Sequence, residues 1–146
     1  MKNHSLIIVA HVITKLELGG AQLNTIYTAE HLDPLRFDAY LISGPGGPLA
    51  TKLLDSKRML FIPALTRKIS VGKDFRAFIS LLRLFCKIRP HIVHTHSSKA
   101  GIVGRLAAFA ARVPVIIHSV HGFSFSPPQP FLKGFFFFFL RSCAGR

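Results

Sequence analysis

Short apolar runs alternate along this chain with longer segments of helical periodicity. The run at residues 6–10 is continuously apolar, which is typical of strands covered on both faces of a parallel sheet. Similar runs follow at intervals that leave room for a helix between them. The pattern predicts strands at residues 5–13, 37–43, 59–65, 92–96 and 115–120.

Helices are predicted between these strands, at residues 21–32, 49–56, 74–88 and from Ser97 or Ser98 to 112. Asp33-Pro34 should end the first, and Asp74 is a plausible N-cap of the third. Two apolar faces are expected. The first comprises Leu23, Ile26, Tyr27 and Ala29, and the second comprises Phe75, Phe78, Ile79, Leu82, Phe85 and Cys86.

Regular alternation of strand and helix predicts an α/β fold: a single Rossmann-like, doubly wound parallel sheet flanked by helices, over residues 1–125. In the last predicted helix, four small residues should allow close approach to the sheet. They are Gly101, Gly104, Ala107 and Ala108. No G-x-G-x-x-G and no G-x-x-x-x-G-K-[ST] sequence occurs, so neither a dinucleotide fingerprint nor a P-loop is predicted.

The net charge of the chain says more about its partners than the rest of its composition does. The 146 residues carry a formal net charge of +13, which favours an anionic partner: an acidic membrane surface, phosphate-bearing ligands or nucleic acid. No RNA-recognition, helix-turn-helix or zinc-finger pattern supports nucleic acid. Cys86 and Cys143 fit no metal or disulfide pattern, so we expect free core thiols and a cytoplasmic protein.

Three loops follow predicted strands and carry polar groups to one sheet edge. They contain Gly19-Gly20, Ser97-Ser98-Lys99 and His121-Gly122. Backbone amides at helix starts, glycines that take positive φ and an ammonium group suit a phosphate. A plain tight turn, an ordinary N-cap beside a solvated lysine and a turn histidine facing water are the alternatives for each loop taken alone.

Two histidines, His94 and His96, flank Thr95 and should lie on one side of their strand. They could begin a zinc site, but the sequence places no third ligand, so no metal is predicted. We expect His96 near the ligand and His94 deeper and structural. Arg67, with Lys68 and Lys73, either contacts an anionic acceptor or is a solvated loop charge.

Four segments together resemble the amino-terminal domain of family-four retaining glycosyltransferases, two-domain GT-B enzymes common in bacterial polysaccharide synthesis. The resemblance covers residues 6–125 and rests on ITKLELGGAQ (13–22), HTHSSKAG (94–101), GRLAA (104–108) and HSVHGF (118–123).

The resemblance implies transfer of a hexose from a nucleotide-sugar to a glycan or lipid-linked acceptor. Gly19 and Gly20 would approach the donor diphosphate, and His121 would contact the reacting sugar. His96, Ser98 and Lys99 would lie near the acceptor and the cleft. The family implies no metal and no cofactor beyond the donor, and a basic domain on the inner membrane face.

The carboxyl end departs from this resemblance. Residues 126–146 include five consecutive phenylalanines at 135–139, and no amphipathic period accounts for them. We expect a truncated last helix and the absence of the donor-binding domain, so that this piece alone should not turn over unless a separate chain completes it. A non-catalytic basic module that docks on anionic membranes or phosphate ligands is the alternative function.

Overall fold

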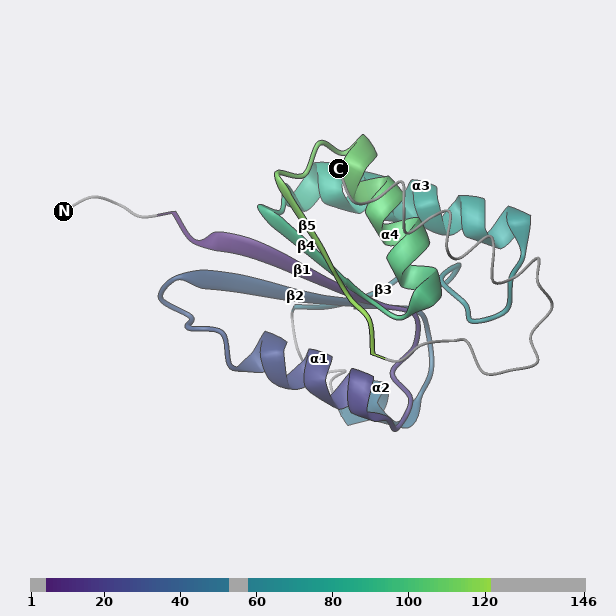
Figure 1. Cartoon of the computed structure of the whole chain (residues 1–146), viewed down its shortest axis with the longest axis horizontal. Helices are drawn as coiled ribbons and strands as arrows, with labels where there is room; N and C mark the ends of the chain where they lie inside the picture. Colours follow the sequence, from purple (N-terminus) through teal and green to yellow (C-terminus); the bar gives the residue numbers. More distant parts are fainter. Residues whose placement is uncertain (1–4, 53–57, 122–146) are drawn as a thin grey trace.

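The computed structural model describes residues 5–52 and 58–121, and the predicted carboxyl-terminal segment 126–146 with Cys143 lies outside them. Strands and helices alternate through the described part (Figure 1). In chain order they are β1 (Ile7–Ile13), α1 (Gly20–Glu30), β2 (Phe37–Ser43), α2 (Pro48–Lys52), β3 (Met59–Phe61), α3 (Val71–Ile88), β4 (Ile92–His96), α4 (Ser98–Ala110) and β5 (Val115–Ser119).

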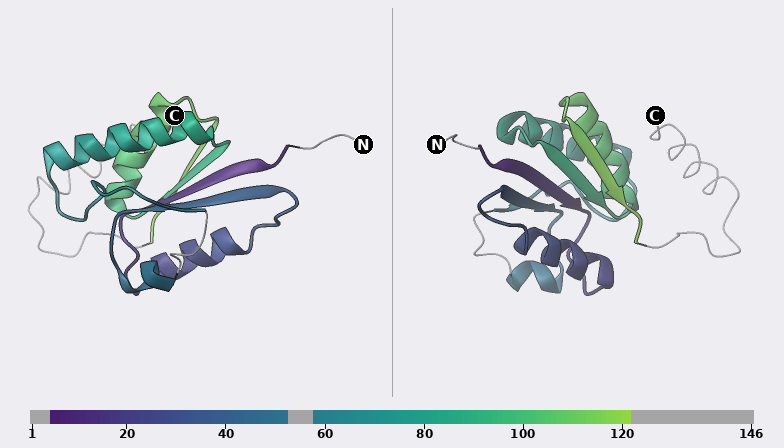
Figure 2. Two further views of the ribbon diagram at one scale, coloured as in Figure 1. Left: turned by 180° about the vertical axis from the view of Figure 1, so that it is seen from behind. Right: turned by 60° about the vertical axis from the view of Figure 1, so that its left-hand side comes forward.

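The five strands form one parallel sheet in the order β3-β2-β1-β4-β5. Helices α1 and α2 cover one face, and α3 and α4 cover the other (Figures 1 and 2). The chain moves outward from β1 to β3, then crosses back through α3 to β4 on the other side of β1. This confirms the predicted doubly wound sheet and puts its topological switch point between β1 and β4.

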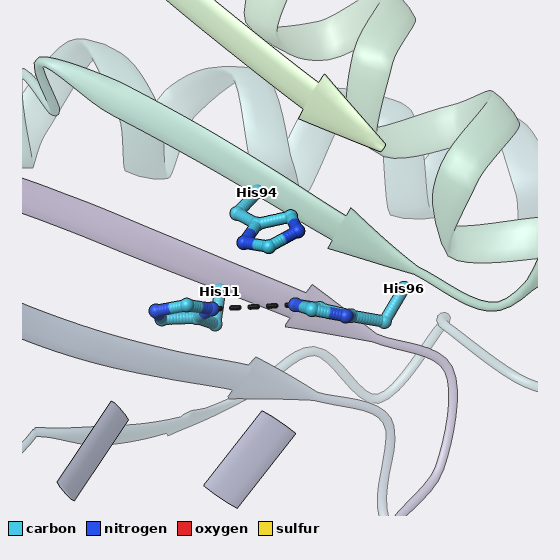
Figure 3. Close-up of side chains that lie close together, drawn as sticks. All are labelled: His11, His94 and His96. Carbon is cyan, nitrogen blue, oxygen red and sulfur yellow. Dashed lines mark hydrogen bonds between the residues drawn. The ribbon is translucent and has the colours of Figure 1, made fainter. Parts of the chain in front are cut away.

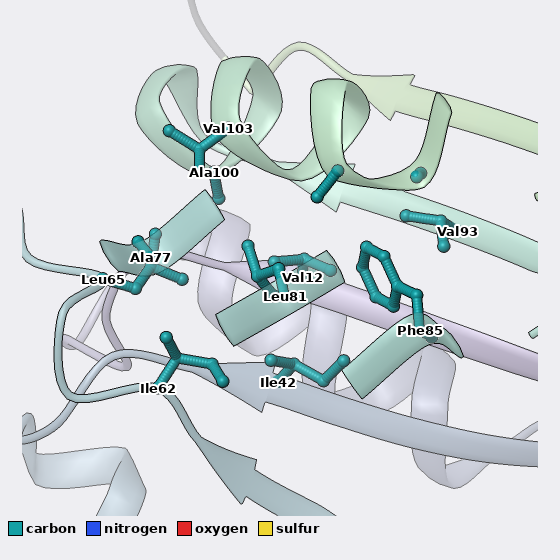
Figure 4. Close-up of a cluster of buried hydrophobic side chains, with 13 residues drawn as sticks. Val12, Ile42, Ile62, Leu65, Ala77, Leu81, Phe85, Val93, Ala100 and Val103 are labelled. Carbon is teal, nitrogen blue, oxygen red and sulfur yellow. The ribbon is translucent and has the colours of Figure 1, made fainter. Parts of the chain in front are cut away.

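The larger apolar core lies between the sheet and the α3–α4 layer (Figure 4). Val12 of β1, Ile42 of β2 and Val93 of β4 are fully buried there against Leu81 and Phe85 of α3. A smaller cluster, centred on Ile13 and Leu16, lies on the α1–α2 side. Alternate residues of β1 therefore enter opposite cores, which explains its continuous apolar sequence.

Helix α4 packs closely on the sheet through its small residues, as predicted. Gly101, Gly104, Ala107 and Ala108 are all buried. A Cβ on Gly101 would come within 2.5 Å of the His118 ring, and one on Gly104 within 2.9 Å of Thr95 Cγ2. Larger side chains would push the helix away from β4 and β5.

The predicted helix faces are partly wrong. In α1, Leu23 and Tyr27 are exposed and Thr25 is buried instead, where its hydroxyl donates to Ala21 O at 2.7 Å. This internal bond satisfies the hydroxyl and lets a polar residue face the core. Tyr27 stacks on His31 with ring centroids 3.8 Å apart.

In α3 the buried residues are Ala77, Leu81 and Phe85. Phe75 is 65% exposed and Cys86 is also exposed, so Cys86 is a free surface thiol and not a core thiol. Helix α3 turns the face that carries Ala77, Leu81 and Phe85 to the sheet because α4 packs along the flank of α3. The predicted apolar stripe is therefore rotated by about one residue position.

Element ends also differ from prediction. Helix α3 begins at Val71 after the N-cap Ser70, and Asp74 is not the cap; its Oδ2 accepts from Ser70 N at 3.2 Å. Strand β3 ends at Phe61, before Pro63, which has no amide proton for a ladder. Helix α4 ends at Ala110, two residues early, and Arg112 has a φ of 57°.

No helix in residues 5–52 and 58–121 is both long enough and apolar enough to cross a bilayer.

Candidate functional site at the carboxyl edge of the sheet

The loops after β1 and β4 are tied together at the switch point. Thr14 Oγ1 and Ser97 Oγ lie 2.8 Å apart, and the Thr14 hydroxyl also accepts from Ala100 N at 3.1 Å. Ala100 is the third residue of α4, so Thr14 performs the capping role that the sequence assigned to Ser97 or Ser98. The first strand thereby fixes the start of the helix that follows the fourth.

Ser97 adopts a left-handed backbone conformation, with a φ of 68°. A residue other than glycine is strained there, by roughly 1–3 kcal/mol. Its hydroxyl compensates by bonding to Thr14, to which it also offers an acceptor for the backbone N at 3.3 Å. The turn aims Ser98 and Lys99 at the sheet edge, where both line a groove.

Gly19 and Gly20 begin α1 without the positive φ values that the sequence suggested. Gly19 is the N-cap in an extended conformation with φ −176°, which any residue adopts. What the glycines provide is open space: among the residues that the structure describes, a Cβ on Gly20 would meet nothing within 4 Å, and one on Gly19 would meet only the end of Gln22. The amides at this helix start are therefore approachable by a ligand.

Cations surround Glu17 in the loop after β1. Lys15 Nζ lies 3.1 Å from Glu17 Oε1, and Arg67 Nη1 lies 3.1 Å from Glu17 Oε2. All three are at least one-third exposed, so these ion pairs contribute little to stability. They do hold two cations against one anion, which leaves a local excess of positive charge.

Lys99 is not the freely available ammonium that the sequence suggested. Its Nζ forms an ion pair with Asp74 Oδ1 at 2.5 Å and donates to Lys68 O at 2.5 Å. Only 13% of the side chain is exposed. The lysine anchors the start of α3 to α4, so Asp74 neutralises much of its charge toward an incoming phosphate.

A long groove of about 1020 Å³ extends from this polar end between α3 and α4. Its polar end includes Arg67, Ser98 and Lys99, and its remaining lining is mainly apolar, with Phe75, Phe78 and Leu106 among the contributors. The structure thus brings three of the predicted acceptor-side residues to one depression.

Histidines form a cluster on the α1 side of the sheet. His11 of β1 pairs in register with His94 of β4, and His96 follows on the same face (Figure 3). His11 Nδ1 lies 3.3 Å from His96 Nε2, and the His94 and His96 ring centroids are 4.1 Å apart. His96 is the more deeply buried of the pair on β4, so the expected depths of His94 and His96 are reversed.

The cluster extends to the sheet edge through hydrogen bonds. His96 Nδ1 lies 2.9 Å from Nε2 of the exposed His121, and His94 Nε2 lies 2.8 Å from Ser119 Oγ. Burial, with help from neighbouring His94, lowers the pKa of His96 to about 3 and that of His11 to about 4. Burial also lowers the pKa of His94. The three imidazoles are therefore neutral at pH 7.

Three residues of this edge escaped sequence reasoning: His11, Thr14 and Ser119. His11 is hidden inside an apolar run, and Thr14 looks like an ordinary loop residue. One signal exists for His11, because it shares strand parity with Ile13 and so faces the α1 side. Its partners become apparent only when β1 is known to lie beside β4.

The predicted site residues thus fall into neighbouring groups at one edge. Arg67, Ser98 and Lys99 line the groove on the α3–α4 side, whereas His96 and His121 lie in the cluster on the α1 side.

Gly19 and Gly20 begin α1 and join neither group directly. Gln22, which lines the groove and donates to Lys15 O at 3.4 Å, provides the link.

Solved structures with this fold confirm its class. The chain superposes on MurG from Acinetobacter baumannii with a TM-score of 0.61 and 19% identity, covering 82% of this chain and 36% of that one. The chain also superposes on a UDP-GlcNAc 2-epimerase from Methanocaldococcus jannaschii with a TM-score of 0.56 and 17% identity, covering 84% of this chain and 34% of that one. These likenesses show the Rossmann-like half of a GT-B fold.

Residues 19–146 match the Glycosyl transferase 4-like domain, and the chain belongs to that family. A galactosyltransferase of Escherichia coli, named UDP-Gal:alpha-D-GlcNAc-diphosphoundecaprenol alpha-1,3-galactosyltransferase, is 48% identical over 84% of this chain. The capsular polysaccharide biosynthesis glycosyltransferase CapM of Staphylococcus aureus is 29% identical over 96%. The chain spans about a third of each relative, 32% and 33%.

Proposed function

We propose that this chain is the acceptor-side domain of a retaining glycosyltransferase, which moves a hexose from a nucleotide-sugar to a glycan or lipid-linked acceptor. Membership of the family and the polar groups gathered at the β1–β4 switch point support this proposal. The E. coli relative, whose name specifies a UDP-galactose donor and a diphosphoundecaprenol acceptor, suggests the substrate class.

The donor diphosphate would approach the start of α1. Gly19 and Gly20 leave its first amides unobstructed, and the positive end of the helix dipole favours a diphosphate leaving group. Stabilising the negative charge that develops on that group is the main catalytic task of such a site. Lys15 and Arg67 add an excess of positive charge nearby.

His121 would contact the reacting sugar. It is exposed at the end of β5, and the neutral His96 ring supports it from behind at 2.9 Å. A histidine so placed can donate a hydrogen bond to a sugar hydroxyl or act as a general acid or base. Transfer should need no resident metal.

The groove between α3 and α4 suits an amphipathic acceptor. Its polar end carries Ser98, the Asp74-paired Lys99 and the exposed Arg67, which can meet a phosphate or sugar, and its apolar length can take a lipid. The single observation that carries a lipid-linked acceptor is this continuity of a polar end with an apolar groove.

A cytoplasmic domain that works on such acceptors would bind the inner membrane face. The net charge of +13 supports attraction to anionic lipid, at about 1 kcal/mol per basic residue near the surface. Flotation with vesicles should show binding to phosphatidylglycerol-containing vesicles and little binding to pure phosphatidylcholine. Equal binding to both would contradict this part of the proposal.

Turnover would require the donor-binding portion, supplied in the same chain or by a separate one. The deciding experiment measures radiolabelled hexose transfer to a diphosphoundecaprenol-linked acceptor, with and without the donor-side domain of the E. coli relative. We expect hexose transfer only when this chain and the donor-side domain are both present. His121→Ala should reduce it at least tenfold, whereas His31→Ala, an exposed histidine outside the edge, should not.

Two results would contradict the proposal. Transfer by this chain alone would show that the donor portion is not needed. Full activity of His121→Ala in the reconstituted system would remove the histidine from the reaction. Membrane or phosphate binding that survives changes at Gly20 and His121, without transfer under any condition, would favour the non-catalytic basic module.

A further inference from the structure

The histidine cluster on the α1 side of the sheet has the composition of a metal site. His11, His94 and His96 each offer a ring nitrogen, and these nitrogens lie within 4.8 Å of one another (Figure 3). The rings come from two neighbouring strands in fixed register, so the backbone alone brings them together. Nothing in the proposed sugar transfer uses His11 or His94.

One pair of ring nitrogens already has the spacing of a tetrahedral zinc site. Zinc–nitrogen bonds of about 2.0–2.1 Å place two ligand nitrogens roughly 3.3 Å apart. His11 Nδ1 and His96 Nε2 are already separated by 3.3 Å. The widest separation in the trio would have to shorten by roughly 1.5 Å, which a rotation of the partly exposed His94 ring can supply.

Two of the ligands have a hydrogen-bond partner for their second ring nitrogen. His94 Nε2 contacts Ser119 Oγ at 2.8 Å, and His96 Nδ1 contacts His121 Nε2 at 2.9 Å. When these nitrogens carry the protons, His96 Nε2 and His94 Nδ1 have free lone pairs. Metal-binding histidines usually donate their second N–H to such a partner.

The free cluster is also incompletely satisfied. His11 is 1% exposed, and its Nε2 has no hydrogen-bond partner among the described residues. Metal bound at His11 Nδ1 would leave this Nε2 unpartnered as well, so the spacing of the ligand nitrogens, and not this atom, favours a metal site. Metal ions bind the neutral form of the imidazole ring.

We propose that His11, His94 and His96 bind a divalent transition-metal ion of the zinc class, with a fourth position left to water. Imidazole nitrogen suits Zn²⁺, Co²⁺, Ni²⁺ and Cu²⁺, and it does not suit Mg²⁺ or Ca²⁺. Bound metal would tie β1 to β4 directly below the switch point. It would also hold His96, and through it His121, in one orientation.

The test titrates the untagged 146-residue chain with Co²⁺ and records the visible absorption that tetrahedral nitrogen coordination produces. We expect a saturable band that Zn²⁺ abolishes and excess Mg²⁺ leaves unchanged. His94→Phe, which keeps a ring at a partly exposed position, should remove the band. Ser119→Ala should weaken binding about 10- to 100-fold, because it removes an outer partner.

His31→Phe is the matched control, because His31 is an exposed histidine outside the cluster, and it should bind as the unaltered chain does. Circular dichroism without metal checks that each variant is folded, and Ser119→Ala provides the test if His94→Phe is not. Absence of the band in the unaltered chain, or a band that persists in both cluster variants, would overturn the proposal. Because no donor or acceptor is used, this result is independent of the sugar-transfer proposal.

Discussion

Individual hydroxyl groups and individual glycines determine how the sheet edge is built. Thr14 is the clearest case, because one side chain connects β1, the strained Ser97 turn and the third amide of α4. Neither its neighbours in sequence nor its residue type suggests that role. The role exists because β1 and β4 are adjacent in the sheet.

Replacing the buried Thr14 with valine should therefore destabilise the fold. Thr14→Val keeps the shape but leaves Ala100 N and Ser97 Oγ without this partner, and loss of a capping hydroxyl costs about 0.5–2 kcal/mol. Urea unfolding measures the change. Thr28→Val, which removes a hydroxyl that donates to Asn24 O in its own helix, should change stability much less. Equal effects would mean that the bridge contributes nothing.

A substitution at Gly20 can test ligand binding without disturbing the fold. A Cβ at Gly20 meets no atom of the described part of the chain within 4 Å, and Gly72 in the first turn of α3 is equally unobstructed there. Gly20→Ala and Gly72→Ala should both leave stability unchanged or raise it slightly, because alanine favours the helix. Only Gly20→Ala should weaken donor use in the reconstituted transfer assay, by about tenfold or more. If both variants transfer sugar normally, no ligand lies against the start of α1.

At the scale of elements, the fit of α4 against the sheet decides how near the β4 and β5 loops lie to each other. The small residues of α4 could be recognised from the sequence, and the structure confirms their burial. The atoms that they meet could not be predicted. Thr95 Cγ2 under Gly104 is one of these contacts.

Gly104→Ala should cost about 1–2 kcal/mol, because its new methyl would come within 2.9 Å of Thr95 Cγ2. In a Thr95→Ser background the same change should be neutral or stabilising. Serine removes the methyl and keeps the hydroxyl that contacts Ile117 O and His118 Nδ1. A double-mutant cycle by urea unfolding measures the coupling. An unchanged cost in the serine background would show that this contact does not set the helix position.

For the whole molecule, the loss of stability at acid pH should come from the histidine cluster. His11 and His96 have pKa values of about 4 and 3, lowered mainly by burial and then by His94, and His11, His121 and His118 lower the pKa of His96 further. An unfolded histidine titrates near 6.5. Below that pH the unfolded chain binds more protons than the folded chain does.

The free energy of unfolding should consequently be highest above pH 6.5 and fall as the pH drops toward 4. Each of the two histidines contributes a slope of about 1.4 kcal/mol per pH unit. Urea unfolding at pH 7.5, 6.5, 5.5 and 4.5 measures it. His96→Gln should flatten the curve and His31→Gln should not. A curve of the same slope in all three proteins would place the acid sensitivity elsewhere.

Much of this molecule was determined by local sequence alone. Apolar runs of strand length, helical periodicity and glycines after strands specify the order of elements, because each depends on neighbours a few residues apart. The same local patterns identified the loops at Gly19, Ser97 and His121 as lying at one edge. That held because the carboxyl ends of parallel strands always share an edge.

Tertiary structure alone decided which side chains meet there. Lys99 is neutralised by Asp74 from another helix, and His11 joins His94 across 83 residues because β1 and β4 are paired. Which face of α1 and α3 turns inward was also settled by packing, since both helices carry apolar residues on more than one side. Contacts between distant segments depend on strand order and helix position, and these follow from burying the whole apolar surface at once rather than from any short stretch of sequence.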